Sequence, residues 1–407
     1  MRARDALLTL CFAAIGGYGA WSWWSQRELE RAPTQKPNPE QLAAPDLPDL
    51  PGHRLPLGPL VITRKDPAHA GRGVPAELAK KNSEAIDALE KGELARAVGL
   101  FEACHAARPE EKVFTENLAE ALARKANHDF DSADDEERTH ALEGMRRAHE
   151  LAPARSDIEG RLAQMEKLAK SEDGFWKDSS EHFDLSYDGE RSDLLGGAFQ
   201  ITPQLERAYQ QYGELFDVWP VDKEKPKIRV VLYKREGFHD ATGIGHWAGG
   251  LFDGTVRVPV EDMQKEKLDL ERVLRHEIAH AFVSAAGGAS VPGWLNEGLA
   301  QYLEYENLSA RAARVQSARK RLQGKELLPL DKLQRSLSEL GDDETIQLAY
   351  SEGLALVDLI DRNFGERVPY QMVAGCKKQS PVADSFRLRT GATLESALAD
   401  LQQDLGR

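Results

Sequence analysis

The sequence predicts an α+β fold, because its strand-like segments are confined to one part of the chain. Short alternating or β-branched stretches occur between about residues 182 and 260, where they are mixed with helical segments. Helical patterns alone fill the chain before this region, from about residue 76, and after it, to the C-terminus. Helices segregated from a small sheet are typical of the α+β class.

The composition limits the class of protein. The chain has 407 residues, of which 41% are hydrophobic and 29% charged, so we expect a globular protein of roughly two or three domains and exclude a multi-span membrane protein. The formal net charge is −14, and an acidic surface repels phosphate, so we expect no nucleic-acid partner. The three cysteines are too few for a disulfide scaffold, and we expect no disulfide.

Residues 1–25 form an apolar segment with charged flanks. Residues 6–24 carry no charge, and about 19 helical residues span roughly the hydrocarbon core of a bilayer, which favours an uncleaved transmembrane anchor. A cleavable signal peptide is the main alternative, since small residues at positions 17, 19 and 20 suit a cleavage site. A lipoprotein signal at Cys11 is disfavoured because Leu10 precedes it. The anchor predicts a single-pass protein of the cell membrane whose C-terminal domains are periplasmic or extracellular; cleavage predicts secretion.

Residues 26–75 are predicted to form a linker. Ten of the 20 prolines fall between Pro33 and Pro75. Proline fixes φ and removes a backbone donor, so this stretch should be an extended, semi-rigid spacer between the membrane segment and the folded part.

Residues 76–172 are predicted to form a helical module. Two stretches share one pattern, in which a small residue is followed by a bulky one, a second small one and a proline at offsets of four, three and five. The members are Ala97, Phe101, Cys104 and Pro109, and Ala141, Met145, Ala148 and Pro153. The pattern resembles tetratricopeptide repeats, which implies antiparallel helix pairs. Two repeats are few for such an array, so we expect the module to pack onto the next domain, either as a groove for a protein partner or as a spacer or lid.

Residues 173–407 are predicted to be one domain with a helical C-terminal part. Strands are expected over residues 182–187, 227–233 and 255–260, and a long helix over residues 194–216. A further helix is expected to begin at Asp269, as its N-cap, and to end at two glycines, residues 287 and 288.

That last helix contains His-Glu-x-x-His. Residues four apart share a helix face, so His276 and His280 can bind one metal ion. Glu277 projects about 100° around the helix, where its carboxylate can reach a water on the metal without becoming a ligand. Zinc lowers the pKa of such a water to about 7, and the carboxylate can accept its proton. The alternative is a helix with two ordinary histidines.

A second helix, after a turn that ends at Pro292, carries Glu297. Packed antiparallel to the first, it would bring Glu297 over the histidine pair and complete a two-His, one-Glu site with an open fourth position, as catalytic zinc requires. The spacing from His280 to Glu297 is short, so one tight turn has to join the two helices.

The two motifs, residues 276–280 and residues 292–300, resemble those of the gluzincin metallopeptidases, particularly the bacterial peptidase-MA-like domains. The resemblance covers about residues 175–364. It implies a thermolysin-like zincin fold, with His276, His280 and Glu297 as Zn²⁺ ligands and Glu277 as the general base. It also implies an edge strand for peptide backbone at residues 247–251. A Tyr or His that stabilises the oxyanion is implied too, and Tyr350 is the candidate; Tyr302 and Tyr305 are nearer in sequence, and core packing would also explain Tyr350.

The resemblance therefore implies a zinc metallopeptidase, endopeptidase-like, that cleaves envelope proteins or peptides and is attached to the membrane by its N-terminal segment. The alternative hypothesis is a non-catalytic scaffold, in which the repeats bind a partner protein and the peptidase domain is a relic. Zinc-dependent hydrolysis of a non-peptide bond is a third.

Overall fold

The computed structural model describes residues 74–406 apart from residues 133, 192–193, 195–196, 223–225, 244–248, 264, 338–339 and 378–380. The predicted membrane segment and almost all of the linker therefore lie outside the described residues. In the part that is described, no helix combines the length and the apolar character needed to cross a bilayer. The described chain is mostly helical with one small mixed sheet, which confirms the α+β class.

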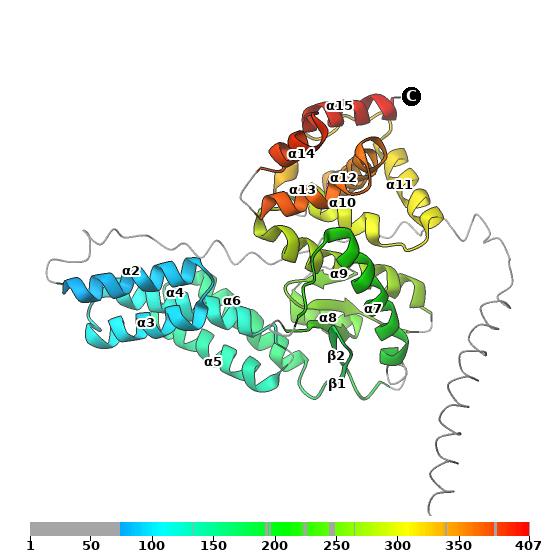
Figure 1. The fold of residues 1–407 in the computed structure, drawn as a ribbon. Helices are drawn as coiled ribbons and strands as arrows, with labels where there is room; N and C mark the ends of the chain where they lie inside the picture. Colours follow the sequence, from blue (N-terminus) through cyan, green and yellow to red (C-terminus); the bar gives the residue numbers. More distant parts are fainter. Residues whose placement is uncertain are drawn as a thin grey trace, which may run out of the picture. The chain divides into compact units, whose positions relative to one another are not determined.

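The helical module consists of consecutive helices packed side by side (Figure 1). They are α2 (Ala76–Glu90), α3 (Leu94–Ala107), α4 (Lys112–Asp129), α5 (Asp135–Leu151) and α6 (Ser156–Ser171). The small and bulky residues of the repeated sequence pattern are all buried between them. Asp134 caps α5, since its side chain accepts hydrogen bonds from the backbone N–H groups of Glu136 and Glu137.

The sheet has five strands in the order β1-β2-β3-β5-β4. They are β1 (Trp176–Ser179), β2 (Phe183–Tyr187), β3 (Ile228–Tyr233), β4 (Leu251–Phe252) and β5 (Val256–Pro259). The strands β2, β3 and β5 are parallel, in a register that aligns Leu185 with Val230 and Val230 with Val256. The outer strands β1 and β4 run antiparallel to their neighbours. The three parallel strands lie within the three ranges predicted from the sequence.

Both faces of the sheet are covered. On one face, Val230 and Leu232 belong to the core shared with α7 (Gly197–Phe216) and α9 (Lys267–Gly287). On the other face, Val231 and Tyr233 belong to the same apolar cluster as the helical module, together with residues of α8 (Arg235–Thr242). Since successive side chains of a strand point to opposite faces, β3 is buried at every position. The module thus packs onto the domain that follows it.

The C-terminal part is helical (Figure 1). It contains α10 (Gly293–Leu303), α11 (Leu308–Leu322), α12 (Asp343–Phe364), α13 (Val368–Cys376), α14 (Val382–Thr390) and α15 (Leu394–Leu405), with short 3₁₀ turns at Gly288–Ser290 and Lys332–Gln334. The helices α10 and α12 cross closely because two glycines face each other. A Cβ on Gly298 would lie 2.5 Å from the Gly353 carbonyl oxygen, and one on Gly353 would lie 2.7 Å from that of Trp294.

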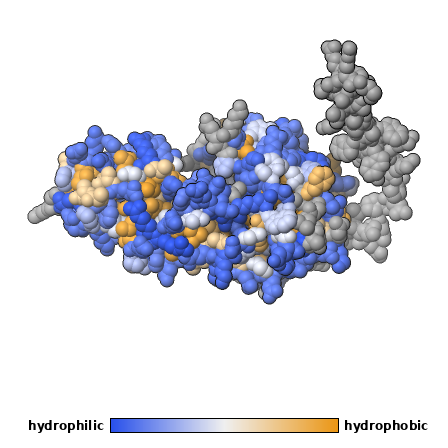
Figure 2. All heavy atoms as spheres, turned by 90° about the horizontal axis from the view of Figure 1, so that it is seen from below, coloured by the Kyte–Doolittle hydropathy of each residue, from blue (hydrophilic) through white to orange (hydrophobic). Residues whose placement is uncertain are grey.

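Hydrophilic residues cover most of the face shown in Figure 2, as the high charged fraction predicts. Both described cysteines, Cys104 and Cys376, are buried free thiols.

Candidate metal centre

The structure brings His276, His280 and Glu297 together in the core, and we call these three residues the metal centre. The Nε2 atoms of His276 and His280 are 3.2 Å apart, and each lies 3.6 Å from Glu297 Oε2. A tetrahedral ion with ligand bonds of roughly 2.0–2.2 Å separates its ligand atoms by about 3.3–3.6 Å. The spacing and the buried position of the three side chains therefore fit a metal ion, and the group could bind one.

Local structure explains how the three side chains meet. The helix α9 begins at Lys267, two residues before the predicted start, so Asp269 lies in its first turn and is not the N-cap. The 3₁₀ turn Gly288–Ser290 then reverses the chain, and α10 begins at Gly293. This turn closes the short spacing between His280 and Glu297.

Two further side chains orient the histidines, and neither was predicted from the sequence. The Nδ1 atom of His276 lies 3.0 Å from Glu304 Oε1, and that of His280 lies 3.0 Å from Asn296 Oδ1. When Nδ1–H donates to such an oxygen, the Nε2 lone pair is directed at the metal position. Asn296 directly precedes Glu297, and Glu304 follows it by seven residues, on the same helical face, which is the signal that could have identified them.

Glu277 is fully buried beside the metal centre, and both of its carboxylate oxygens lack a hydrogen-bond partner among the described residues. The backbone of the edge strand approaches it closely, since a Cβ on Gly250 would lie 2.6 Å from Glu277 Oε1. Of the predicted edge strand, residues 247 and 248 lie outside the described residues. Leu251 starts β4, which is the last strand of the sheet and contacts α9.

Tyr350 lies on α12, near enough to Glu297 and Glu277 for their charges to act on its hydroxyl. Its backbone carbonyl accepts a hydrogen bond from Gln301 Nε2 at 2.9 Å, which links α12 to α10. Its hydroxyl is buried and has no hydrogen-bond partner among the described residues. Burial, followed by the nearby charges of Glu297 and Glu277, holds the pKa of Tyr350 well above its usual value. In contrast, the hydroxyl of Tyr302 donates to Asp361 Oδ2 at 2.9 Å, so it already has a structural partner.

The pKa values of the site residues are coupled to the buried carboxylates around them. Burial lowers the pKa of His276, but its hydrogen bonds to Glu297 and Glu304 outweigh burial and raise the pKa to about 10. Burial raises the pKa of Glu277 to about 8, opposed by His276 and increased by Glu297 and Glu304. Burial lowers the pKa of His280. A metal ion needs neutral imidazoles, so it would replace the proton that the carboxylates hold on His276.

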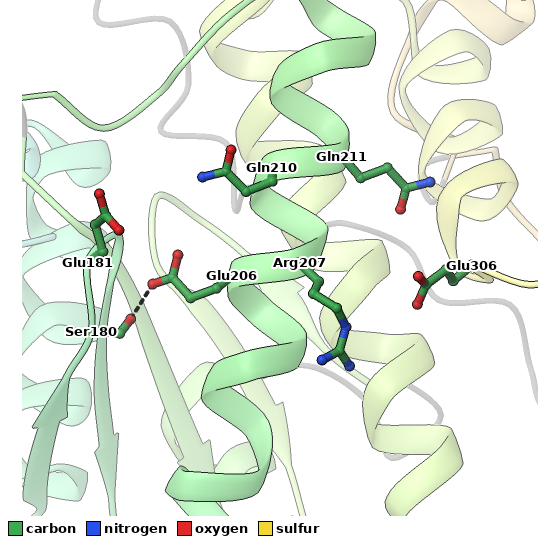
Figure 3. Close-up of a pocket in the computed structure, with 7 residues that line it drawn as sticks. All are labelled: Ser180, Glu181, Glu206, Arg207, Gln210, Gln211 and Glu306. Carbon is green, nitrogen blue, oxygen red and sulfur yellow. Dashed lines mark hydrogen bonds between the residues drawn. The ribbon is translucent and has the colours of Figure 1, made fainter. Parts of the chain in front are cut away.

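A surface hollow of about 560 Å³ is lined by none of the metal-centre residues (Figure 3). Its lining consists of Ser180, Glu181, Glu206, Arg207, Gln210, Gln211 and Glu306. Glu206 has a structural role there, since it accepts hydrogen bonds from the Ser180 hydroxyl at 2.6 Å and from the His182 backbone N–H at 3.0 Å. The hollow therefore adds no residue to the site.

No protein-family model matches the chain, and neither does any of the curated proteins searched.

Proposed function

We propose that the chain is a zinc metallopeptidase with a gluzincin-like site in a thermolysin-like domain. The observation that carries the proposal is the buried His276, His280 and Glu297 group with Glu277 beside it, whose carboxylate has no hydrogen-bond partner among the described residues. Two imidazoles and one carboxylate are a common ligand set of catalytic zinc. The resemblance of the two motifs to gluzincins supports the same assignment.

Each residue has a role in this proposal. His276, His280 and Glu297 would hold the ion, which when bound supplies Lewis acidity and lowers the pKa of water to about 7. Glu277 accepts the proton of the attacking water and passes it to the leaving amine, a general-base and general-acid role. The Tyr350 hydroxyl donates a hydrogen bond to the substrate carbonyl oxygen, on which negative charge develops during the reaction. Neither group has a hydrogen-bond partner within the described part of the chain, which supports these two roles.

The proposal includes the cellular setting. The apolar residues 1–25 attach the chain to the cell membrane, and the proline-rich linker holds the peptidase outside the cytoplasm, where its substrates are envelope proteins or peptides. This part of the proposal depends on the sequence alone.

The test is Glu277→Gln, which keeps the shape of the side chain and removes its basicity. We expect the variant to keep its metal and to lose about 10²- to 10⁴-fold in hydrolysis of denatured proteins or a random peptide library. Glu271→Gln, on the same helix but outside the metal centre, is the control and should cleave like the wild type. A Glu277→Gln variant that cleaves at the wild-type rate would remove the assigned base. Partner capture by the repeats, with no hydrolysis by metal-loaded wild type, would favour the scaffold hypothesis.

A further inference from the structure

The sheet face opposite α9 is joined to the helical module by buried charges. Glu172 lies just after α6, and its almost fully buried side chain accepts hydrogen bonds from arginines on three different elements. They are Arg138 on α5 at 2.7 Å, Arg229 on β3 at 2.5 Å and Arg257 on β5 at 2.5 Å. Burial alone would raise the pKa of Glu172, but the three arginines outweigh it and lower the pKa to about 2. One carboxylate of the module therefore binds two neighbouring strands.

The module also contacts the turn between β4 and β5. Asp253 in this turn pairs with Arg257, Nε to Oδ2 at 3.2 Å. Asp131, which follows α4, lies against Gly254, and any Cβ at Gly254 would overlap the Asp131 carboxylate. Gly254 has φ of +109°, a conformation that favours glycine. The turn is thus shaped to receive a carboxylate from the module.

The other end of the same short hairpin touches the candidate site. Gly250 lies against Glu277 and against Val273, where a Cβ would come within 2.9 Å of the Val273 side chain. Leu251, the next residue, belongs to the apolar cluster of the module. Residues 250–254 therefore connect the module directly to the Glu277 carboxylate.

We propose that the helical module positions the β4–β5 hairpin over Glu277, with Glu172 and Asp131 as the positioning residues. The module is then a working part of the peptidase site and not a spacer. The inference rests on the proposed function for its effect on hydrolysis, but its effect on the hairpin is independent of any activity.

The test compares three variants of the metal-loaded full chain by hydrogen–deuterium exchange. Glu172→Gln removes the charge that binds both strands, and Gly254→Ala pushes the turn away from Asp131 without removing any charge. Glu166→Gln is the control, because it changes an acid of α6, the helix that Glu172 follows, and breaks only an exposed pair with Arg146 of α5. We expect faster exchange of residues 249–257 in the first two variants only, with α9 exchange and metal content unchanged.

Hydrolysis provides the second readout. We expect kcat to fall by about 10- to 100-fold in Glu172→Gln and Gly254→Ala, because the hairpin no longer holds its place beside Glu277. Glu172→Asp, which keeps the charge, should recover part of the loss. If Glu172→Gln fails to fold, the exchange and the kcat of Gly254→Ala alone test the inference.

Three results would overturn the inference. They are hairpin exchange equal to wild type, uniformly faster exchange that includes α9, or a looser hairpin with unchanged kcat. If the wild type hydrolyses no peptide at all, the proposed function fails, while the exchange experiment still decides whether the module holds the hairpin.

Discussion

The metal centre and the interface between module and sheet both bury charged side chains, but they differ in how those charges are paired. Around the metal centre, Glu297 and Glu304 lie against two imidazoles, and Glu304 also pairs with Arg272 and Arg314. Both carboxylate oxygens of Glu277 have no hydrogen-bond partner among the described residues. At the interface, four arginines face three carboxylates. These are Arg138, Arg161, Arg229 and Arg257, and Glu172, Asp131 and Asp253.

The pKa values show what this difference means. At the interface the arginines lower the pKa of Glu172 to about 2, so its charge is compensated within the protein. Beside the metal centre, burial raises the pKa of Glu277 to about 8, and the nearby His276 opposes this only in part. A buried charge without compensation is costly, and such groups are concentrated at functional sites. The charge of Glu172 is therefore compensated within the protein, whereas the metal centre could bind a cation.

Removal of a metal ligand should give the largest effect. Glu297→Ala takes away the only carboxylate of the three-residue group, so we expect about one metal ion per chain in the wild type and little or none in the variant. Elemental analysis after purification with zinc present measures this without any substrate. Glu306→Ala, an exposed acid just beyond the same helix, is the control. Equal metal content in Glu297→Ala and wild type would show that the centre is not the metal site.

The interface should respond in stability and not in metal content. Arg257→Met removes the arginine that pairs with Asp253 and with one oxygen of Glu172, and both carboxylates stay buried. We expect this to cost about 3–5 kcal/mol in the free energy of unfolding. Chemical denaturation measures the change. Arg146→Met, which breaks an exposed pair, should change stability little. If Arg257→Met unfolds at the wild-type denaturant concentration, the interface is not held by these charges.

The sequence predicted the parts of both regions that depend on local spacing. His276 and His280 share a helix face because they are four residues apart, and β3 was recognisable from its β-branched run. The interface could not be predicted in this way. Glu172 lies in a polar helix end, and its partners Arg229 and Arg257 are 57 and 85 residues away. By strand alternation those arginines belong on a solvent face, and only the covering module makes that face buried.

A buried carboxylate outside both regions has neither an arginine nor a histidine as its partner. Glu352 on α12 is buried and accepts one hydrogen bond, from the backbone N–H of Leu328 at 2.9 Å. Burial raises its pKa from 4.5 to about 7, and the hydrogen bond only partly opposes this. The folded protein therefore holds a proton that the unfolded chain releases between about pH 4.5 and 7, so stability should fall as pH rises through this window.

Glu352→Gln should remove that part of the pH dependence, by up to roughly 3 kcal/mol between the two ends of the window. Denaturation of metal-loaded protein at a series of pH values measures it. Glu344→Gln changes an exposed acid of the same helix and should keep the wild-type slope. A slope that persists in Glu352→Gln would assign the proton to another group.

The smallest effect is expected from substitution of Glu304, which contacts both a histidine of the metal centre and two arginines. Glu304 supports His276, yet it also lies 3.4 Å from Arg272 and 3.8 Å from Arg314, so it is compensated like Glu172 while it acts on the metal centre. Glu304→Gln keeps a hydrogen-bond acceptor for His276 Nδ1 but removes the charge that makes the imidazole a stronger ligand. Loss of such a partner weakens metal affinity by about 10- to 100-fold, against the near-complete loss expected for Glu297→Ala. Competition with a zinc chelator measures the affinity, and Glu306→Gln is the control. A zinc affinity equal to that of the wild type would mean that Glu304 only pairs with the arginines. Metal binding would then depend only on the three side chains predicted from the sequence.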